Sequence, residues 1–364
     1  MLEKLLIFSA HQGEFSPHRG GPVGFIGQNF FEPVSDEVMY SWAENKENPD
    51  TSIIARIHRK LTKKREQFPS AKAQAAHTHY KMINAASYRA VYFLNFMELA
   101  SCIDLIPDNQ TVVFHPLNPE NYLQQLKNAG ARGEVIRWVE ARIERAYGRV
   151  NAFVFASEGC KEIYREYLPD THHSFFLPSG CRTQVHPHPV PLDPGKVYGL
   201  FLGRRLAVKG YDLLVDMLPI LEEACPDMHI IIGGPGECLP PGPNYTDLGV
   251  IEDPSQWMSS VDFLISVNRS SYFDFAILES LRCGTPLIMT QTEGHAFFAE
   301  DAFPTTAITG LEPSAAVRDV QSSIYNAKLS CEDRVRIQDM AERVFGPNAF
   351  RSNFLKLSKE ILVL

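Results

Sequence analysis

The sequence of 364 residues has no apolar stretch that approaches the ~18–20 residues of a membrane-spanning helix. Its seven cysteines are scattered without a CxxC pair, and their number is odd. This usage is typical of reduced thiols and favours a cytoplasmic compartment over a disulfide framework. The strand-like run Leu5–Phe8 follows the first four residues with no basic region or small-residue cleavage site, so we expect no secretory signal.

Basic stripes interleaved with aromatic residues are also missing, which argues against a nucleic-acid partner. The net charge is −8, and the acidic excess falls in the second half of the chain. An apolar fraction of 45% and a charged fraction of 21% are ordinary for a soluble globular protein, and the length suits two domains.

One short segment is strongly basic, since residues 56–65 hold six Lys and Arg side chains around an apolar stripe that includes Ile57 and Leu61. Two interpretations stay open. The segment is either a solvated helix that packs its stripe on a sheet, or a helix that docks on anionic lipid, where each basic residue contributes ~1 kcal/mol.

Strand-like runs alternate with helical patterns in both halves of the chain, which predicts an α/β fold of two doubly wound domains with parallel sheets. The expected strands are Leu5–Ala10, Ala90–Leu94, Thr111–Phe114, Ala152–Ala156, Val197–Leu202, His229–Ile232, Phe263–Val267 and Pro286–Met289. Helices are expected over residues 134–147, from Tyr211 onward and through Glu279.

A proline-rich segment, residues 186–195, cannot form a helix or a central strand and is interpreted as the linker. We therefore expect an N-terminal domain over residues 1–190 and a C-terminal domain over 191–345. The last segment, 346–364, has helical spacing, and we expect this helix to cross back to the N-terminal domain.

Two cations, Arg204 and Lys209, lie on a predicted loop between a strand and a helix, in the run Gly203–Gly210. Arg can give two parallel hydrogen bonds to phosphate oxygens, and Lys supplies a compact charge. The start of the following helix favours the same anion. The pattern therefore predicts a diphosphate site, although two surface cations on a solvated turn have the same appearance.

A carboxylate, Glu279, lies in a short predicted helix that ends at Gly284 and Pro286. This helix follows the predicted strand Phe263–Val267, so its start should lie at the carboxyl edge of a sheet, where ligands bind. A carboxylate in that place can bind the hydroxyls of a ribose. The alternative is an ordinary exposed helix residue.

The order of these motifs resembles a large family of retaining glycosyltransferases, group 1 and family 4-like, that includes bacterial sucrose synthases and phosphatidylinositol mannosyltransferase. The motifs are Gly203-Arg204…Lys209-Gly210, Gly233-Gly234-Pro235-Gly236 and Phe273…Leu278-Glu279…Gly284-Thr285-Pro286. The resemblance covers nearly all of residues 196–345. It implies the GT-B fold, in which two Rossmann-like domains face a central cleft, a nucleotide-diphosphate sugar as the sugar donor, and no metal or other cofactor.

The resemblance also implies roles for individual residues. Gly20 and Gly21, in the run His18–Pro22, match the glycine-rich loop that approaches the donor phosphates, and His115 matches a strand-end histidine beside the donor sugar. Arg204, Lys209 and His115 are the expected catalytic residues. The remaining expected contacts to the nucleotide sugar are Pro235, Val250, Ser271, Ala276, Ile277 and Glu279.

One position departs from the family pattern, which has two glutamates eight positions apart. Glu279 matches the second, which contacts ribose, whereas the first falls on Ser271. A hydroxyl offers no charge, and charge-assisted hydrogen bonds are roughly twice as strong as neutral ones. This departure therefore bears on which sugar is bound and how tightly.

These observations predict a retaining, metal-independent glycosyltransferase that moves a sugar from a UDP- or GDP-sugar to a glycan or lipid-linked acceptor. Its expected setting is bacterial surface polysaccharide or lipopolysaccharide biosynthesis, in the cytoplasm or on the inner face of the membrane. A non-catalytic nucleotide-sugar-binding subunit is the main alternative. An NAD-dependent oxidoreductase fits less well, because no G-x-G-x-x-G follows the first strand of either half.

Overall fold

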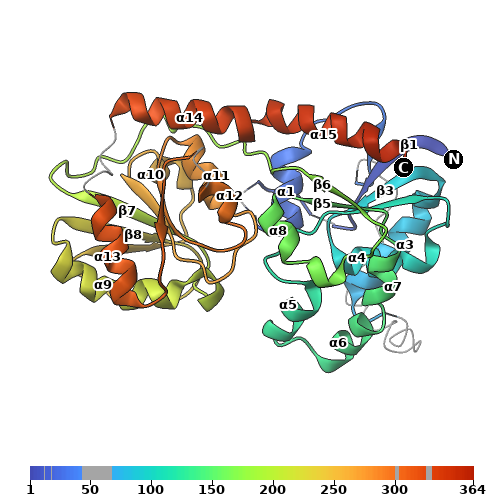
Figure 1. Cartoon of the computed structure of the whole chain (residues 1–364), viewed down its shortest axis with the longest axis horizontal. Coiled ribbons are helices and arrows are strands. Elements are labelled where there is room, and N and C mark those ends of the chain that lie inside the picture. Colours follow the sequence, from blue (N-terminus) through green and yellow to red (C-terminus); the bar gives the residue numbers. More distant parts are fainter. Residues whose placement is uncertain (12, 18, 43–67, 300–302, 325–329) are drawn as a thin grey trace. The chain divides into compact units, whose positions relative to one another are not determined.

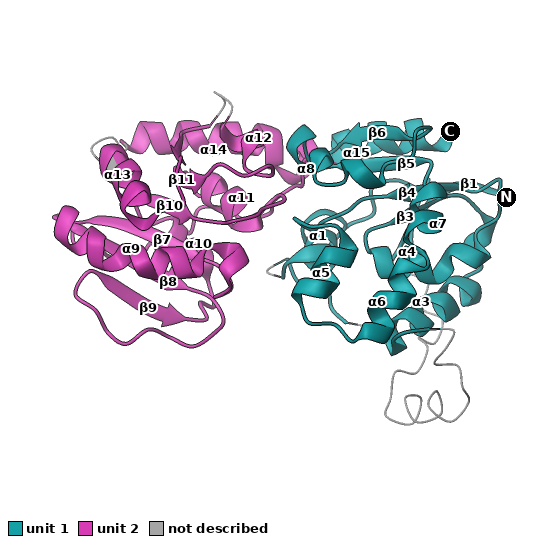
Figure 2. Cartoon of the chain, turned by 60° about the horizontal axis from the view of Figure 1, so that its bottom comes forward, with its two compact units in different colours: residues 1–177, 351–364 teal, residues 178–350 magenta. Residues whose placement is uncertain are grey.

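The structure is a computed structural model that describes residues 1–11, 13–17, 19–42, 68–299, 303–324 and 330–364. Contacts divide the chain into two compact units, residues 1–177 with 351–364 (unit 1) and residues 178–350 (unit 2), coloured separately in Figure 2. The division falls at residue 177, so the proline-rich segment 186–195, which forms no helix or strand, belongs to unit 2.

Unit 1 is built on a six-stranded parallel sheet in the order β2-β1-β3-β4-β5-β6. Its strands are β1 (Leu2–Phe8), β2 (Val38–Tyr40), β3 (Tyr88–Phe93), β4 (Thr111–Phe114), β5 (Ala152–Phe155) and β6 (His173–Phe176). Its helices are α1 (Gly21–Asn29), α3 (Ala71–Met82), α4 (Phe96–Cys102), α5 (Tyr122–Asn128), α6 (Gly133–Glu140), α7 (Ile143–Gly148) and α8 (Glu158–Glu162), with 3-10 turns at Ala85–Ser87, Ile103–Leu105 and Arg165–Tyr167.

Unit 2 repeats this architecture with a second six-stranded parallel sheet, in the order β12-β11-β10-β7-β8-β9. Its strands are β7 (Val197–Leu202), β8 (Met228–Gly233), β9 (Tyr245–Gly249), β10 (Phe263–Ser266), β11 (Leu287–Thr290) and β12 (Thr305–Ile308). Its helical segments are η4 (Ala207–Lys209), α9 (Tyr211–Ala224), α10 (Pro254–Met258), α11 (Phe275–Arg282), α12 (Ala296–Ala299), α13 (Pro313–Ile324), α14 (Cys331–Phe345) and the start of α15 (Pro347–Leu362).

Each sheet is covered by helices, as Figure 1 shows, and its central strands are buried on both faces. Four successive residues of β1, Leu5 to Phe8, are fully buried, which is the continuous apolar run expected of a central parallel strand. In unit 2 the apolar faces of α9 and α13 pack on β7, β8 and β10 in one core. The predicted α/β fold of two doubly wound sheets is therefore confirmed.

A glycine in β7 shows how tightly this second sheet packs. A Cβ atom at Gly199 would lie 2.6 Å from the ring of Phe263 on the neighbouring strand β10. Such a contact is too short for any side chain, so glycine leaves the space that the aromatic ring fills.

The C-terminal helix α15 contributes to unit 1 from Arg351 onward. The Arg351 guanidinium donates a hydrogen bond to the Val34 carbonyl at 3.0 Å, and the Phe354 ring packs edge-on against Phe30 with ring centroids 4.9 Å apart.

The single helix predicted over residues 134–147 is wrong. The structure has two helices there, α6 and α7, with a turn at Ala141–Arg142. Arg142 has φ −123° and ψ −12°, outside helical values, so the backbone changes direction between the two helices although the apolar spacing continues.

Candidate functional site

Two loops of unit 2 meet at the carboxyl edge of its sheet. One loop, residues 203–210, follows β7, and the other, residues 267–274, follows the neighbouring parallel strand β10. The Arg269 N–H donates to the Val208 carbonyl at 3.1 Å. Gly210 has φ +66°, and a Cβ there would lie 1.7 Å from the Val267 carbonyl oxygen, so only glycine permits this approach.

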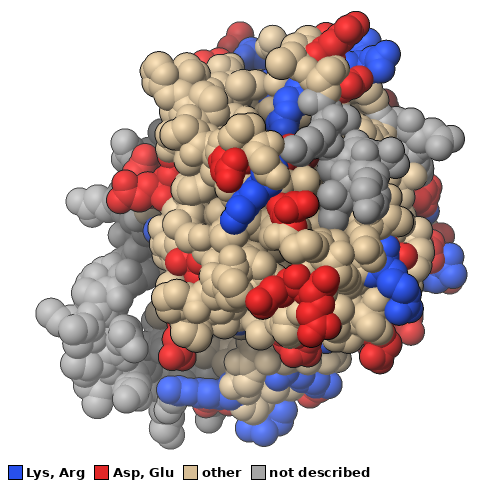
Figure 3. Space-filling view, turned by 90° about the vertical axis from the view of Figure 1, so that its left-hand side faces the viewer, with Lys and Arg blue, Asp and Glu red and all other residues tan. Residues whose placement is uncertain are grey.

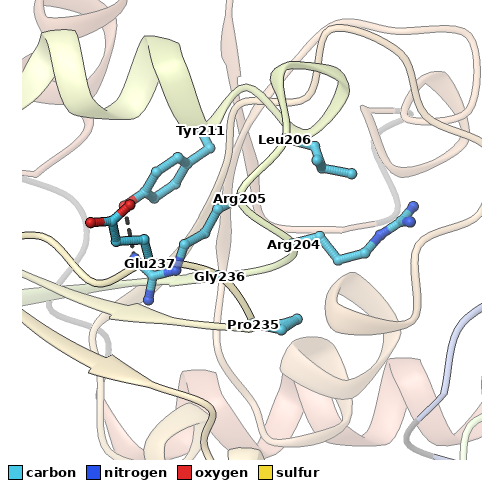
Figure 4. Close-up of a pocket in the computed structure, with 7 residues that line it drawn as sticks. All are labelled: Arg204, Arg205, Leu206, Tyr211, Pro235, Gly236 and Glu237. Carbon is cyan, nitrogen blue, oxygen red and sulfur yellow. Dashed lines mark hydrogen bonds between the residues drawn. The ribbon is translucent and has the colours of Figure 1, made fainter. Parts of the chain in front are cut away.

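The first predicted cation, Arg204, is exposed at this edge and lines a cavity of about 420 Å³. Figure 4 shows Arg204 and its neighbour Arg205 extending in opposite directions from the loop. The cavity is lined by Arg204, Arg205, Leu206, Tyr211, Pro235, Gly236 and Glu237. Arg204 is thus placed to meet an anion that approaches the loop.

The adjacent Arg205 has a different role that the sequence did not reveal. Its guanidinium forms a buried ion pair with Asp247 of β9, with one hydrogen bond of 2.6 Å, and donates to the Tyr211 hydroxyl at 2.7 Å. These bonds raise the pKa of Arg205. Burial opposes ionisation of Asp247, but the hydrogen bonds from Arg205, Leu239 and Gly249 and the Arg205 charge together lower its pKa to about 2. The pair therefore fixes the loop to the sheet. In the sequence, two adjacent arginines were its only signal.

The second predicted cation, Lys209, already has a partner. Its Nζ lies 2.5 Å from Oδ1 of Asp274, and the two side chains are 20% and 21% exposed. Asp274 is the N-cap residue of α11, but its side chain makes no capping hydrogen bond to that helix. The carboxylate is therefore directed across to the other loop.

The second oxygen of Asp274 is also bound. Asn268 Nδ2 donates to Oδ2 at 2.5 Å, and His295 Nε2 lies 3.4 Å from the same oxygen. Nδ1 of the fully buried His295 donates to the Thr290 carbonyl at 2.8 Å. Burial favours the neutral acid, but the Lys209 charge and the His295 hydrogen bond outweigh it and hold the pKa of Asp274 far below its ordinary value.

The hydroxyl expected to bind the sugar and the carboxyl expected to bind the ribose are both buried. Ser271 is fully buried and its hydroxyl is hydrogen-bonded to the Thr292 hydroxyl. Glu279 is 8% exposed, and burial raises the pKa of its carboxyl from 4.5 to about 7, against the opposing hydrogen bond from Thr183. Glu279 therefore keeps its proton to a higher pH than an exposed carboxyl does.

The start of α11 offers backbone donors at the same edge. The Ile277 N–H already donates to the Asp274 carbonyl at 3.1 Å. The N–H groups of Phe275 and Ala276 precede the first intrahelical hydrogen bond, so they are the donors that this helix leaves for an anion. Of the other predicted contacts in unit 2, Pro235 lines the cavity and Val250 is 71% exposed.

In unit 1 the predicted glycines lie at the start of α1. Gly20 is its N-cap residue and Gly21, with φ +66°, is its first residue. A Cβ atom on either would meet no other atom within 4 Å, so the backbone is open to a ligand there. His18 lies outside the described residues.

His115, at the end of β4, is fully buried. Its Nδ1 lies 2.7 Å from the Tyr92 hydroxyl, and its ring packs edge-on against Phe25 with centroids 4.9 Å apart. Burial lowers the pKa of His115 to about 3, so the ring is neutral, and Nε2 has no hydrogen-bond partner among the described residues.

A carboxylate that the sequence analysis missed, Glu98, lies at the carboxyl edge of the unit 1 sheet. The Ala10 N–H, just after β1, donates to it at 2.7 Å, and burial raises the pKa of Glu98 to about 7. A lone Glu in an apolar helix was the only available signal.

Neither a metal centre nor a membrane span is found in the part of the chain that the structure describes. No group of three or more His, Cys, Asp and Glu side chains in that part could hold a metal ion. Likewise, none of the helices in it is long and apolar enough to cross a bilayer.

The basic segment 56–65 lies outside the described residues. On the face in Figure 3, acidic and basic side chains are interspersed.

Two doubly wound parallel sheets, the second with a cation-bearing loop opposite a helix start, define the GT-B class of fold. Residues 196–321 match the family model described as Glycosyl transferases group 1, which confirms the resemblance to group 1 for that segment. No curated protein matches the sequence.

Solved structures with this fold are similar at low sequence identity. Sucrose-phosphate synthase from Thermosynechococcus elongatus has a TM-score of 0.69 and 13% identity, covering 99% of this chain and 98% of its own. HepE from Anabaena, in complex with UDP and glucose, has a TM-score of 0.66 and 12% identity, covering 98% and 99%. The catalytic domain of starch synthase IV from Arabidopsis thaliana, bound to ADP and acarbose, has a TM-score of 0.59 and 9% identity, covering 80% and 77%.

Proposed function

We propose that this protein is a retaining glycosyltransferase that moves a sugar from a nucleotide-diphosphate sugar to a glycan or lipid-linked acceptor. The main support for the proposal is that the loop bearing Arg204 and Lys209 contacts the start of α11. Both lie inside the segment that matches glycosyltransferases group 1. A fold shared with HepE in complex with UDP and glucose supports a UDP-sugar as the first candidate, with a GDP-sugar as the second.

In this proposal the diphosphate binds between Arg204, Lys209 and the N–H groups at Phe275 and Ala276. Glu279 binds the ribose, and Pro235 and Val250 border the nucleotide. On the resemblance alone, we also assign Gly20 and Gly21 to the phosphates and His115 to the sugar. The exposed Arg204 is free to give a bidentate contact, whereas Lys209 must serve both the phosphate and Asp274.

Catalysis then consists mainly of stabilising the departing diphosphate and aligning the acceptor. The bond between the anomeric carbon and the phosphate oxygen breaks, and the acceptor oxygen bonds to the same face of the sugar. The acceptor proton passes to the departing phosphate oxygen. These steps need no metal, and we propose that the enzyme works without one.

For the biological setting we propose bacterial surface polysaccharide or lipopolysaccharide synthesis in the cytoplasm. The basic segment 56–65 would then be a docking site on the inner face of the membrane.

A second candidate is a nucleotide-sugar-binding subunit without catalytic activity. The observation that favours it is the buried Ser271, whose hydroxyl is engaged by Thr292, at the position where the family has a carboxylate.

A thermal-shift screen of UDP-, GDP-, ADP- and CMP-sugars tests the proposal, because each ligand stabilises the protein in proportion to its occupancy. We expect one nucleotide class to raise Tm, and the matching sugar donor to be turned over with the anomeric configuration kept, as read by NMR. Binding without turnover would favour the second candidate, and the absence of any shift would contradict both.

A further inference from the structure

Asp274 is the carboxylate that unit 2 presents at the edge where its two loops meet. In the segment 271–279, Ser271 is fully buried and Glu279 is 8% exposed, whereas the Asp274 side chain is 21% exposed. The hydroxyl of Ser271 is bonded to Thr292, and Glu279 accepts a hydrogen bond from Thr183. Asp274 is therefore the acidic side chain of this segment with the most access to a ligand.

Its position is fixed from two sides. Lys209 binds Oδ1 from the loop after β7, while Asn268 and His295 approach Oδ2. Each oxygen of an ionised carboxylate has about two acceptor positions, and Lys209 occupies one of those on Oδ1, which leaves the other for a further donor. The low pKa of Asp274 means that this acceptor is charged at neutral pH.

This arrangement is a poor one for phosphate binding alone. A negative charge beside Lys209 competes for the ammonium and repels an arriving diphosphate, since like charges a few ångströms apart oppose each other strongly. A neutral residue would leave Lys209 and the α11 N–H groups freer to bind the anion. The carboxylate therefore needs a role that phosphate does not supply.

Binding of sugar hydroxyls is such a role, because a carboxylate accepts strong, charge-assisted hydrogen bonds from them. We propose that Asp274 recognises the sugar of the nucleotide-sugar donor, with Oδ1 accepting a hydrogen bond from a sugar hydroxyl while Lys209 bridges Asp274 and the diphosphate. This inference rests on the proposed function. It assigns the charge that is missing at Ser271 to a residue three positions later.

The test compares the nucleotide sugar that binds best in the thermal-shift screen with its own nucleoside diphosphate, by isothermal titration. The quantity of interest is the Kd of the nucleoside diphosphate divided by the Kd of the nucleotide sugar, because this ratio isolates the contribution of the sugar. Asp274→Asn should reduce this ratio about tenfold or more, since it removes the charge-assisted bond. The affinity for the bare nucleoside diphosphate should stay the same or increase.

Asp212→Asn is the matched control. Asp212, in α9, pairs at 2.7 Å with Arg269 of the loop after β10, and both side chains are 40% or more exposed. Neither residue is assigned a contact with the nucleotide sugar. This variant should leave the ratio of Kd values unchanged. If Asp274→Asn does not fold, Asp274→Gly provides the same comparison without a misplaced amide.

Deoxygenated versions of the nucleotide sugar give a second measurement. In the wild type, removal of the hydroxyl that Asp274 recognises should weaken binding about tenfold, and in Asp274→Asn the same removal should have little effect. Equal weakening of nucleotide and nucleotide sugar by Asp274→Asn would overturn the inference, because Asp274 would then only position Lys209. Wild-type protein that binds no nucleotide sugar would instead overturn the proposed function itself.

Discussion

Arg205 and Asp247 form an ion pair whose side chains are only 5% and 2% exposed, and it joins the loop after β7 to strand β9. Removal of one partner from a buried pair leaves an uncompensated charge, which typically costs about 3–5 kcal/mol. We predict that Arg205→Ala lowers the free energy of unfolding of unit 2 by about that amount, measured by urea denaturation. Arg204→Ala is the control one residue away, and we expect it to change stability by less than about 0.5 kcal/mol. Similar losses in the two variants would contradict the division of roles between these arginines.

Arg204, whose removal should hardly change stability, should be important for activity. We predict that Arg204→Ala or Lys209→Ala lowers kcat/KM by at least ~100-fold, which is about 2.7 kcal/mol of transition-state stabilisation. The expected loss in Lys209→Ala combines a missing phosphate contact with the loss of the ammonium that binds Oδ1 of Asp274. Steady-state kinetics with the identified sugar donor provide the measurement, and near-wild-type rates in both variants would refute the phosphate assignment.

Glu279 makes the stability of the protein depend on pH. Its pKa is raised from 4.5 to about 7 by burial, so between these values the folded protein holds a proton that the unfolded chain has lost. This group therefore lowers stability as pH rises through that window, by up to about 3 kcal/mol. Glu279→Gln abolishes the effect, so its stability relative to wild type should increase from pH 4.5 to 7. Denaturation curves of both proteins at several pH values check this. A difference in the free energy of unfolding that stays constant with pH would contradict the raised pKa of Glu279.

The same titration should appear in nucleotide binding. If the ionised carboxylate binds ribose, wild-type affinity for the bare nucleoside diphosphate should rise as pH increases through about 7. Glu279→Gln should bind more weakly at pH 8, by about 1–3 kcal/mol, and show no such rise. Titration calorimetry of the two proteins at pH 6 and 8 decides it, because equal affinities at both values would remove Glu279 from the site.

Ser271→Glu should lower both stability and turnover. Ser271 is fully buried against Thr292, and overpacking of such a position costs about 1–3 kcal/mol. Ser271→Ala, which removes only the hydroxyl, is the milder comparison at about 0.5–1.5 kcal/mol. Thermal unfolding and sugar-donor turnover are the two readouts. A clear gain of turnover in Ser271→Glu would favour the non-catalytic binding subunit.

The basic segment 56–65 predicts binding to anionic but not zwitterionic vesicles, weakening as salt rises, because exposed charges are screened beyond about 8 Å at physiological ionic strength. Charge reversal at Lys60, Lys63 and Lys64 should abolish co-sedimentation and leave nucleotide binding intact. Equal binding to both vesicle types would identify the segment as a solvated face.

The sequence predicted the central strands and missed the edges. All eight strands predicted from apolar runs are found within a few residues of their expected bounds. Among the described residues four further strands were missed, and these are the edge strands β2, β6, β9 and β12. The residues of β6 and β9 are exposed or half-buried, so they carry no continuous apolar run. Central strands are recognisable because both of their faces must be apolar.

The candidate site was predictable only as far as its residue types and their places along the chain. Arg204 and Arg205 are adjacent and chemically identical, and only the packing of β9 determines which of them is buried. Likewise, the pairing of Lys209 with Asp274 joins residues 65 positions apart, and no local pattern encodes it. The Glu279 carboxyl likewise forms a hydrogen bond with Thr183, which lies in a distant segment of the chain.

The glycosyltransferase site is tested most directly by the release of free nucleoside diphosphate from a panel of nucleotide sugars. The release is measured with wild-type protein and with Arg204→Ala at a temperature where both proteins are folded. We predict that wild-type protein releases the diphosphate from one class of sugar donor, and that Arg204→Ala does so at least ~100-fold more slowly. Equal rates in the two proteins, or no release from any nucleotide sugar by the wild type, would contradict a glycosyltransferase site at this edge of the sheet.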